Sequence, residues 1–342
     1  MDFVIHSMIL VLNVGSTSIK FGLYDRNERE VNRGVLSWNG SVATGVKHVL
    51  REIGNPDIIE AVGHRVVHGG NEYSAPVVID ADVIKNITTC NALAPLHNPY
   101  NIEGINAARL WLSAIPHIAV FDTAFFSVLP KRAQMYAIPF DYFEDGIRRY
   151  GFHGISHEYL IQETARLLQK KENDINLITC HLGGGASITA IKKGKPIDTS
   201  MGFTPMEGLM MMSRCGDIDP GLLVYLQKKG VDIEHFISHE SGFAGMLKTQ
   251  DFLEVIEKVK KNHPKARLAF DLFLYKLAKY IGAYSAILET VDALVISGGI
   301  GTGDPFTLAS LEKSYPWIKK FHILTIETNE EKAIARKAIP FL

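Results

Sequence analysis

The chain has 342 residues, which is more than one ordinary domain holds and enough for two. Its 36 Lys and Arg residues are balanced by 37 Asp and Glu residues, so the net charge is −1 and there is no basic surplus to hold a nucleic-acid backbone or an anionic membrane. Hydrophobic residues make up 46% and charged residues 21%, as in packed globular proteins, which excludes a disordered chain.

The cysteines indicate a reducing compartment. Cys90, Cys180 and Cys215 are widely spaced with no C-x-x-C pair, which argues against a disulfide framework and a zinc site. No Lys or Arg precedes Lys20, so the apolar start lacks the basic region of a signal peptide, and no apolar run reaches the roughly 18 residues of a membrane span. We expect a soluble cytoplasmic protein with no nucleic-acid or membrane partner.

The first predicted element is a hairpin, because residues 8–25 form an apolar run, a polar Gly/Ser turn and a second strand-like run. Residues 176–191 repeat this plan around a triple-glycine turn. The two copies lie about half a chain apart. We therefore predict a duplicated fold with one such hairpin in each lobe.

Strands alternate with helices between the two hairpins. Buried strands are predicted at residues 58–67 and 117–121, and helical spacing of apolar residues marks residues 101–113 and 157–170. This alternation predicts α/β layers.

Two helices in the second half have clear boundary signals. Asp219 and Pro220 suit the N-cap and first position of a helix that ends at Gly230. Pro264 precedes a long helical pattern that continues to about residue 289.

A strand and a final helix complete the chain. Residues 293–296 form a short buried strand that leads into a glycine loop at residues 297–301. The last helix is predicted at residues 329–338, with Thr328 and Glu331 as a capping-box pair.

The chain contains no Pro/Ser-rich linker, so the boundary between lobes must be a compact crossover, which we place near residues 142–150. We predict an N-terminal lobe of residues 1–145, to which the C-terminal segment 329–342 returns. Residues 146–328 form the C-terminal lobe.

Three glycine- or hydroxyl-rich turns, at residues 15–18, 183–187 and 298–303, follow predicted strands. Such turns suit phosphate binding, because glycine lets backbone N–H groups close on an anion, although each alone could be an ordinary tight turn. Neither a P-loop motif nor a Rossmann glycine motif is present. The pattern favours another phosphate-handling fold.

Five side chains could carry chemistry. Arg65 and Arg214 lie in apolar or glycine-flanked surroundings, where a guanidinium is costly unless it binds a carboxylate or phosphate; a structural ion pair is the alternative. Asp122 ends a buried strand and could be functional or a helix N-cap. His153 and His181 could donate hydrogen bonds to phosphoryl oxygens or be ordinary interior histidines.

Together these segments resemble the acetate kinase family of the acetate and sugar kinase, Hsp70 and actin superfamily. The resemblance rests on eight segments in family order, at residues 13–20, 63–70, 93–98, 121–125, 150–157, 181–187, 198–220 and 328–331. It implies two RNase H-like lobes around a central cleft, a homodimer, and Mg²⁺-dependent phosphoryl transfer between ATP and a short carboxylate.

The resemblance also implies roles for individual residues. The metal contacts are Asn13 and Glu330. The catalytic residues are Asp122, Arg214 and His153. The substrate residues are Arg65, which holds the carboxylate, and the methyl pocket of Val67, Leu96, Phe152 and Pro205. The nucleotide phosphates are held by Ser16, Ser18, Lys20, His181, Leu182, Gly183, Gly184, Gly185, Gly299, Ile300, Gly301, Thr302 and Gly303.

Elementary chemistry agrees with these roles. A carboxylate nucleophile with a pKa of roughly 4 is already ionised at pH 7, so no strong general base is required and Asp122 is better suited to orient Mg²⁺ or its water. The reaction needs in-line positioning and positive charge near the moving phosphoryl group, which suits Arg214. Closure of the lobes would exclude competing water.

The chain departs from the family pattern on the nucleoside side. The usual Asn of the glycine turn is Gly184, the usual Glu-Asn after Gly-Ile-Gly is Thr302 and Gly303, and residues 247–251 replace a nucleoside-contacting Asp-Met-Arg. The chain is also shorter than usual by tens of residues. The acetate side is therefore retained more fully than the adenosine side.

We interpret the sequence as an acetate kinase-like enzyme that makes acetyl phosphate reversibly from ATP and acetate. A propionate kinase, or an acetate kinase with another donor such as pyrophosphate, is the alternative within this class. A catalytically silent carboxylate- or nucleotide-binding regulator is the alternative outside it, and the retained Arg65, Asp122, Arg214 and Glu330 argue against that reading.

Overall fold

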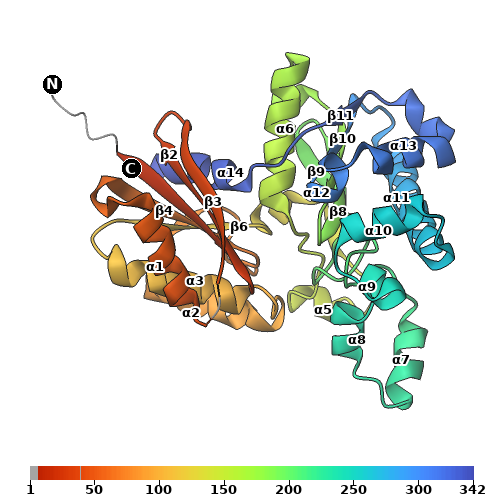
Figure 1. The fold of residues 1–342 in the computed structure, drawn as a ribbon, viewed down its shortest axis with the longest axis horizontal. Coiled ribbons are helices and arrows are strands. Elements are labelled where there is room, and N and C mark those ends of the chain that lie inside the picture. The colour runs from red at the N-terminus through yellow and green to blue at the C-terminus, as the bar shows by residue number, and fades with distance from the viewer. Residues whose placement is uncertain (1–6, 39) are drawn as a thin grey trace. The chain divides into compact units, whose positions relative to one another are not determined.

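The computed structural model describes residues 7–38 and 40–342 and contains two compact α/β units (Figure 1). The first unit comprises the chain up to Ser127 together with Phe152–Tyr159 and Asn329–Leu342. The second comprises Val128–Gly151 and Leu160–Thr328. In the part of the chain described, no helix combines the length and the apolar character needed to cross a membrane.

The first unit is built on a six-stranded sheet in the order β3-β2-β1-β4-β6-β5. Strands β1, β2 and β3 form an antiparallel meander, β1, β4 and β6 are parallel, and β5 is antiparallel to β6. The strands are β1 Met8–Val14, β2 Ser18–Asp25, β3 Glu30–Ser37, β4 Ile59–Val66, β5 Val77–Val78 and β6 His117–Phe121.

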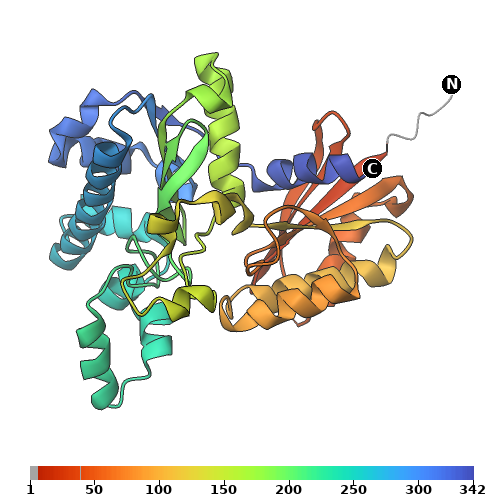
Figure 2. The same cartoon turned by 180° about the vertical axis from the view of Figure 1, so that it is seen from behind.

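Helices cover both faces of this sheet. They are α1 Val42–Ile53, α2 Ala81–Thr89, α3 Asn98–Trp111 and α14 Glu330–Ala338. Leu10 and Leu12 pack in a core with residues of α1 and α3. Strand side chains alternate between faces, so Val11 and Gly63 lie on the opposite face, against Ile334 of α14. Figure 2 shows α14 lying along the sheet.

The second unit has a five-stranded sheet in the order β11-β10-β7-β8-β9. Its strands are β7 Leu177–Leu182, β8 Ala186–Lys192, β9 Lys195–Thr199, β10 Ala293–Ser297 and β11 Ile323–Thr325. Here too an antiparallel meander of three strands is extended by two parallel strands. This matches β3-β2-β1-β4-β6, so the predicted duplication is confirmed at the level of topology.

The remaining helices are associated mainly with the second unit. They are α4 Lys131–Gln134, α5 Asp141–Glu144, α6 Gly154–Leu168, α7 Pro220–Lys228, α8 Ile233–His239, α9 Gly242–Leu247, α10 Phe252–Lys260, α11 Pro264–Leu288, α12 Gly299–Thr302 and α13 Pro305–Ser314. Asp219 caps α7 by accepting a hydrogen bond from Gly221 N–H, and Gly230 follows with a positive φ. The boundary signals of α7 and α11 are confirmed.

Two details differ from expectation. The predicted Thr328–Glu331 capping box is wrong: the N-cap of α14 is Asn329, whose side chain accepts a hydrogen bond from Lys332 N–H at 2.8 Å, and Glu331 instead accepts from Asn13. The two units are also not separated at a single point near residue 145. Residues 128–145 belong to the second unit, and 152–159 belong to the first.

Candidate active site

A buried cluster on the α14 face of the first sheet contains four of the predicted site residues. Arg65 Nη2 is 2.7 Å from Asp122 Oδ2, and Arg65 Nε also donates to this carboxylate. Arg65 Nη1 is 3.3 Å from Asn13 Oδ1 and 3.4 Å from Glu330 Oε2. Asn13 Nδ2 donates to Glu330 Oε2 at 3.3 Å. The structure thus brings the expected carboxylate clamp, acid and metal contacts together.

Strand alternation explains this convergence. Asn13 follows Val11 by two residues on β1, and Arg65 follows Gly63 by two on β4, so both side chains lie on the face that α14 covers. Asp122 comes directly after β6. Because β1, β4 and β6 are parallel neighbours, their carboxyl ends meet at one edge of the sheet.

Burial and charge shape the electrostatics of the cluster. Burial raises the pKa of Asp122; Arg65 opposes this effect and Glu330 adds to it. Burial alone would lower the pKa of Arg65, but the carboxylates of Asp122 and Glu330 outweigh it and raise this pKa above its ordinary value. Arg65 is therefore a permanent cation held between carboxylates.

The residues present fit a magnesium ion. Asp122, Glu330 and Glu331 are each less than a tenth exposed, and Arg65 balances one of their charges, so a further cation is favoured. Carboxylate and amide oxygens suit Mg²⁺, which typically takes one or two protein ligands plus water and substrate phosphates. Among residues 7–38 and 40–342, no three or more His, Cys, Asp or Glu side chains are arranged so that they could together hold a metal ion. A Mg²⁺ site with one or two protein ligands does not require such a group.

Ser16 lies in the turn between β1 and β2, and Ser18 and Lys20 lie on β2. Gly15 N–H donates to Ser18 O at 2.8 Å and closes the turn. Lys20 lies directly opposite Asn13 in the antiparallel ladder, so the two side chains share a face of the sheet. Ser16 and Lys20 are exposed.

Three of the four predicted methyl-pocket residues belong to the first unit. Asn101 of α3 accepts a hydrogen bond from Val67 N–H at 3.1 Å, which fastens the end of β4 to the helix that follows Leu96. The rings of His68 and Phe152 meet edge to face at 5.5 Å. Val67 and Phe152 are buried and Leu96 is half-buried. Pro205 is buried in the second unit.

His153 lies beside the charged cluster. Its backbone hydrogen bonds to the Asp122 carboxylate, and Gly154 N–H donates to Asp122 O at 3.0 Å. Gly154 packs so closely on the Asp122 carbonyl that a Cβ would clash with it, which is why glycine is required at the start of α6.

The predicted nucleotide loops converge in the second unit. Ser297 at the end of β10 pairs with His181 near the end of β7, and Gly183 N–H donates to Gly185 O across the triple-glycine turn. Gly298 has φ +81° and packs against the backbone of Leu182, so only glycine fits. Gly184, Gly299 and Gly303 are exposed, whereas Leu182, Ile300 and Gly301 are buried and Thr302 is intermediate.

Arg214 lies on a loop that contacts the glycine turn through the hydrogen bond from Met212 N–H to Gly184 O at 3.2 Å. Its Nη1 donates to Pro205 O at 3.2 Å. Burial lowers the pKa of Arg214 to about 10, which keeps the guanidinium protonated at neutral pH. The second unit thus places a cation near backbone groups suited to phosphate.

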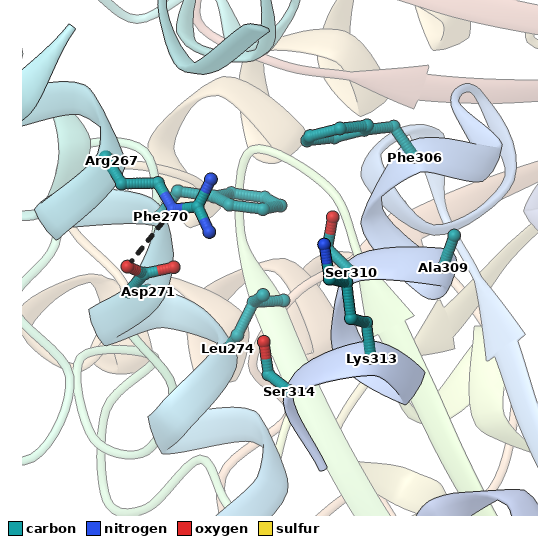
Figure 3. A pocket seen from close by; sticks show the side chains of 9 residues that line it. All are labelled: Arg267, Phe270, Asp271, Leu274, Phe306, Ala309, Ser310, Lys313 and Ser314. Atoms are coloured by element: carbon teal, nitrogen blue, oxygen red, sulfur yellow. Dashed lines mark hydrogen bonds and ion pairs between the residues drawn. The ribbon is translucent and has the colours of Figure 1, made fainter. Parts of the chain in front are cut away.

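A separate pocket of about 200 Å³ lies between α11 and α13 (Figure 3). Arg267 and Lys313 face each other across it, and the stacked rings of Phe270 and Phe306 form a wall. Of the described residues that line this pocket, none is a predicted site residue.

Sequence reasoning missed Glu331 as a member of the charged cluster. Glu331 Oε1 accepts a hydrogen bond from Asn13 Nδ2 at 3.1 Å. The available signal was the pair of adjacent acidic residues at the start of the helix, of which we assigned Glu330 to the metal and Glu331 to capping.

Comparison with known proteins defines the class. Residues 39–335 match the acetokinase family. The acetate kinase of Carboxydothermus hydrogenoformans is 36% identical over 390 aligned positions, which cover 97% of this chain and 98% of that protein. Since 390 exceeds the chain's length, that relative has insertions that the chain lacks.

Solved structures agree. A propionate kinase from Francisella tularensis superposes with a TM-score of 0.90 at 36% identity, covering 97% of this chain and 98% of the other. The Porphyromonas gingivalis acetate kinase gives a TM-score of 0.87 at 33% identity, covering 98% and 99%. Fold and site therefore define a phosphotransferase with a carboxyl group as acceptor. The chain belongs to the acetokinase family.

Proposed function

We propose that this protein is an acetate kinase, which transfers a phosphoryl group reversibly from ATP to acetate and yields acetyl phosphate and ADP. The observation that carries the proposal is the Asn13–Arg65–Asp122–Glu330 cluster. It combines, in one buried place, a cation able to hold a carboxylate and oxygen atoms able to hold a metal.

The chemistry assigns each group a task. Acetate is ionised at pH 7, so its carboxylate attacks the terminal phosphorus without a general base. Arg65 holds the acetate oxygens, and we assign the methyl group to Val67, Leu96, Phe152 and Pro205. Arg214 and His153 stabilise charge on the phosphoryl oxygens in the transition state, and Asp122 would orient a bound Mg²⁺ or its water.

Mg²⁺ held by Asn13 and Glu330 would neutralise the nucleotide phosphates when bound. In support, both side chains reach the same buried cluster. Glu330→Gln is expected to raise the Mg²⁺ concentration needed for half-maximal activity and to weaken Mn²⁺ binding measured by calorimetry. Unchanged metal binding would contradict the assignment.

The ATP phosphates would be held by the glycine turns at residues 183–185 and 299–303. The resemblance assigns Ser16, Ser18 and Lys20 to the nucleotide phosphates as well. A different donor, such as pyrophosphate, is favoured by one observation. Gly184 is exposed, and a Cβ there would meet no atom within 4 Å in the part of the chain that the structure describes. The asparagine that the family resemblance leads us to expect here is a glycine in this chain.

We further propose a cytoplasmic homodimer. Leu268, Leu272 and Tyr275 of α11 lie on one helix face and are 65%, 37% and 49% exposed, an apolar stripe suited to a second copy. The three cysteines, none of which forms a disulfide, suit a reducing compartment. Light scattering during gel filtration tests the dimer, and a monomeric mass would contradict it.

One hydroxamate assay tests the activity. Acetyl phosphate reacts with hydroxylamine to a coloured product, so acetate and propionate can each be assayed with ATP, GTP, ITP and pyrophosphate. We expect turnover with acetate and ATP. Preference for propionate would make the protein a propionate kinase. Absence of turnover with every pair would contradict the proposal and favour a binding regulator.

A further inference from the structure

One network of partly buried polar side chains in the second unit has no task in the mechanism above. Arg149 Nη1 donates to the backbone carbonyl oxygens of three consecutive residues, Thr199, Ser200 and Met201, at 3.0, 3.3 and 3.0 Å. Its Nη2 lies 2.5 Å from Glu207 Oε1. A single side chain thus fastens the end of β9 and the start of the segment that follows it.

Tyr136 completes the network. Its hydroxyl donates to Glu207 Oε2 at 2.5 Å and accepts a hydrogen bond from Phe203 N–H at 2.8 Å. The Tyr136 and Glu207 side chains pack directly on Gly202, where a Cβ would clash with both. Tyr150 N–H donates to Gly202 O at 3.0 Å. Backbone groups of residues 199–203 are therefore held by side chains and backbone of residues 136–150.

The segment held by this network, residues 199–203, is connected to Arg214 through Pro205. It continues to Pro205, whose carbonyl oxygen accepts the 3.2 Å hydrogen bond from Arg214 Nη1. The loop that bears Arg214 is closed at its ends, because Gly208 N–H donates to Asp217 Oδ1 and Asp217 N–H donates to Gly208 O, both at 2.9 Å. A shift of the Pro205 carbonyl would therefore displace one hydrogen-bond acceptor of the Arg214 guanidinium.

Forming this network costs free energy, because the charged groups of Arg149 and Glu207 lose part of their hydration. The side chains of Arg149 and Glu207 are only 17% and 32% exposed, and partly buried charge pairs are often replaceable by apolar residues without loss of stability. Directional hydrogen bonds, in contrast, position a backbone more sharply than apolar contacts do.

We propose that Tyr136, Arg149 and Glu207 are positioning residues, which set the Pro205 carbonyl and through it the Arg214 guanidinium for phosphoryl transfer. The inference rests on the proposed function, since it requires Arg214 to act on the phosphoryl group. It extends that function to three residues that contact neither substrate nor nucleotide in the mechanism.

The test is a double-mutant cycle between Tyr136→Phe and Arg214→Ala in the full chain. Tyr136→Phe removes both hydrogen bonds of the hydroxyl and keeps the ring. We expect kcat to fall by about 10- to 100-fold, as for small displacements of a catalytic group, with the KM for acetate and ATP nearly unchanged. In the Arg214→Ala background the same change should lower kcat no further.

Controls separate positioning from folding. Tyr73→Phe removes another half-buried hydroxyl, which accepts a hydrogen bond from Asn86 Nδ2 at 3.1 Å in the first unit, and should leave kcat unchanged. Glu207→Gln keeps the side-chain shape and should reproduce the kcat loss. It serves as the second variant if Tyr136→Phe does not fold.

The outcomes are distinct. An active protein whose kcat is unaffected by Tyr136→Phe and Glu207→Gln, or falls equally in both backgrounds, overturns the inference and leaves the proposed function intact. A wild-type protein without carboxylate kinase activity contradicts the proposed function and this inference with it.

Discussion

The two units share one sheet topology and present different kinds of functional groups. In the first, β1, β4 and α14 bring together the side chains of Asn13, Arg65 and Glu330. In the second, β7 and β10 lead into glycine turns, in which Gly184, Gly299 and Gly303 are exposed. The comparison teaches that strand order positions a site at the carboxyl ends of the strands, while turn composition and the facing helix decide its chemistry.

The charges of the two units are also held differently. Arg65 is paired with Asp122 and Glu330 before any ligand binds. The Arg214 guanidinium donates a hydrogen bond to the Pro205 carbonyl, a neutral acceptor. We therefore expect changes in the first unit to act mainly on acceptor binding, and changes at Arg214 to act mainly on turnover.

The largest expected effect is that of Arg214→Ala. Because its charge is needed mainly in the transition state of phosphoryl transfer, kcat should fall by about 10³-fold or more while the KM for acetate changes little. Arg267→Ala is the matched control, since Arg267 is an exposed arginine of the same unit paired with Asp271. Near-normal kcat in Arg214→Ala would remove the assigned role.

Arg65→Ala should act on binding. Loss of a buried, hydrogen-bonded cation that holds a carboxylate costs roughly 2 to 5 kcal/mol, so the KM for acetate should rise by about 100-fold. Stability to urea should fall too, because Asp122 and Glu330 lose their counter-charge. Arg26→Ala, which breaks an exposed pair with Glu60, should change neither quantity. A normal KM would assign Arg65 to a structural ion pair.

Val67→Ala should shift acceptor preference. Removing two methyl carbons from a buried side chain makes room for one extra methylene, so the propionate-to-acetate ratio of kcat/KM should rise by about 10- to 200-fold. The neighbouring Val66 packs in an apolar core with Ile105 and Phe121. Val66→Ala should therefore lower stability without changing the propionate-to-acetate ratio. An unmoved ratio in Val67→Ala would show that the methyl pocket lies elsewhere.

The smallest expected effect concerns the donor base. If, as the resemblance implies, the phosphate-facing glycine turns are retained and the nucleoside-side residues are replaced, binding energy from the base should be low. We expect ATP to have a weak KM and GTP and ITP to be used within about tenfold of it, with pyrophosphate as an alternative donor, because remote contacts contribute little discrimination. Tight, adenine-selective use of ATP would contradict this.

Local signals predicted the elements well. The strand expected at residues 117–121 is β6 with the same bounds, and the helices opened by Pro220 and Pro264 begin at those residues. Hydrophobic periodicity, N-caps and proline act over a few neighbouring residues, so they can be read without knowing the fold. The repeated hairpin also predicted the duplicated topology.

The sequence by itself therefore determined the α/β class, the element order, the family resemblance and the residue types of the site. Only tertiary structure decided which partner each charge takes. Asn13 and Glu331 are 318 residues apart in the chain, and Arg149 and Glu207 are 58 apart. No local periodicity encodes such pairs, because their distance depends on sheet pairing and on α14 packing against the first sheet, which form only when remote segments meet.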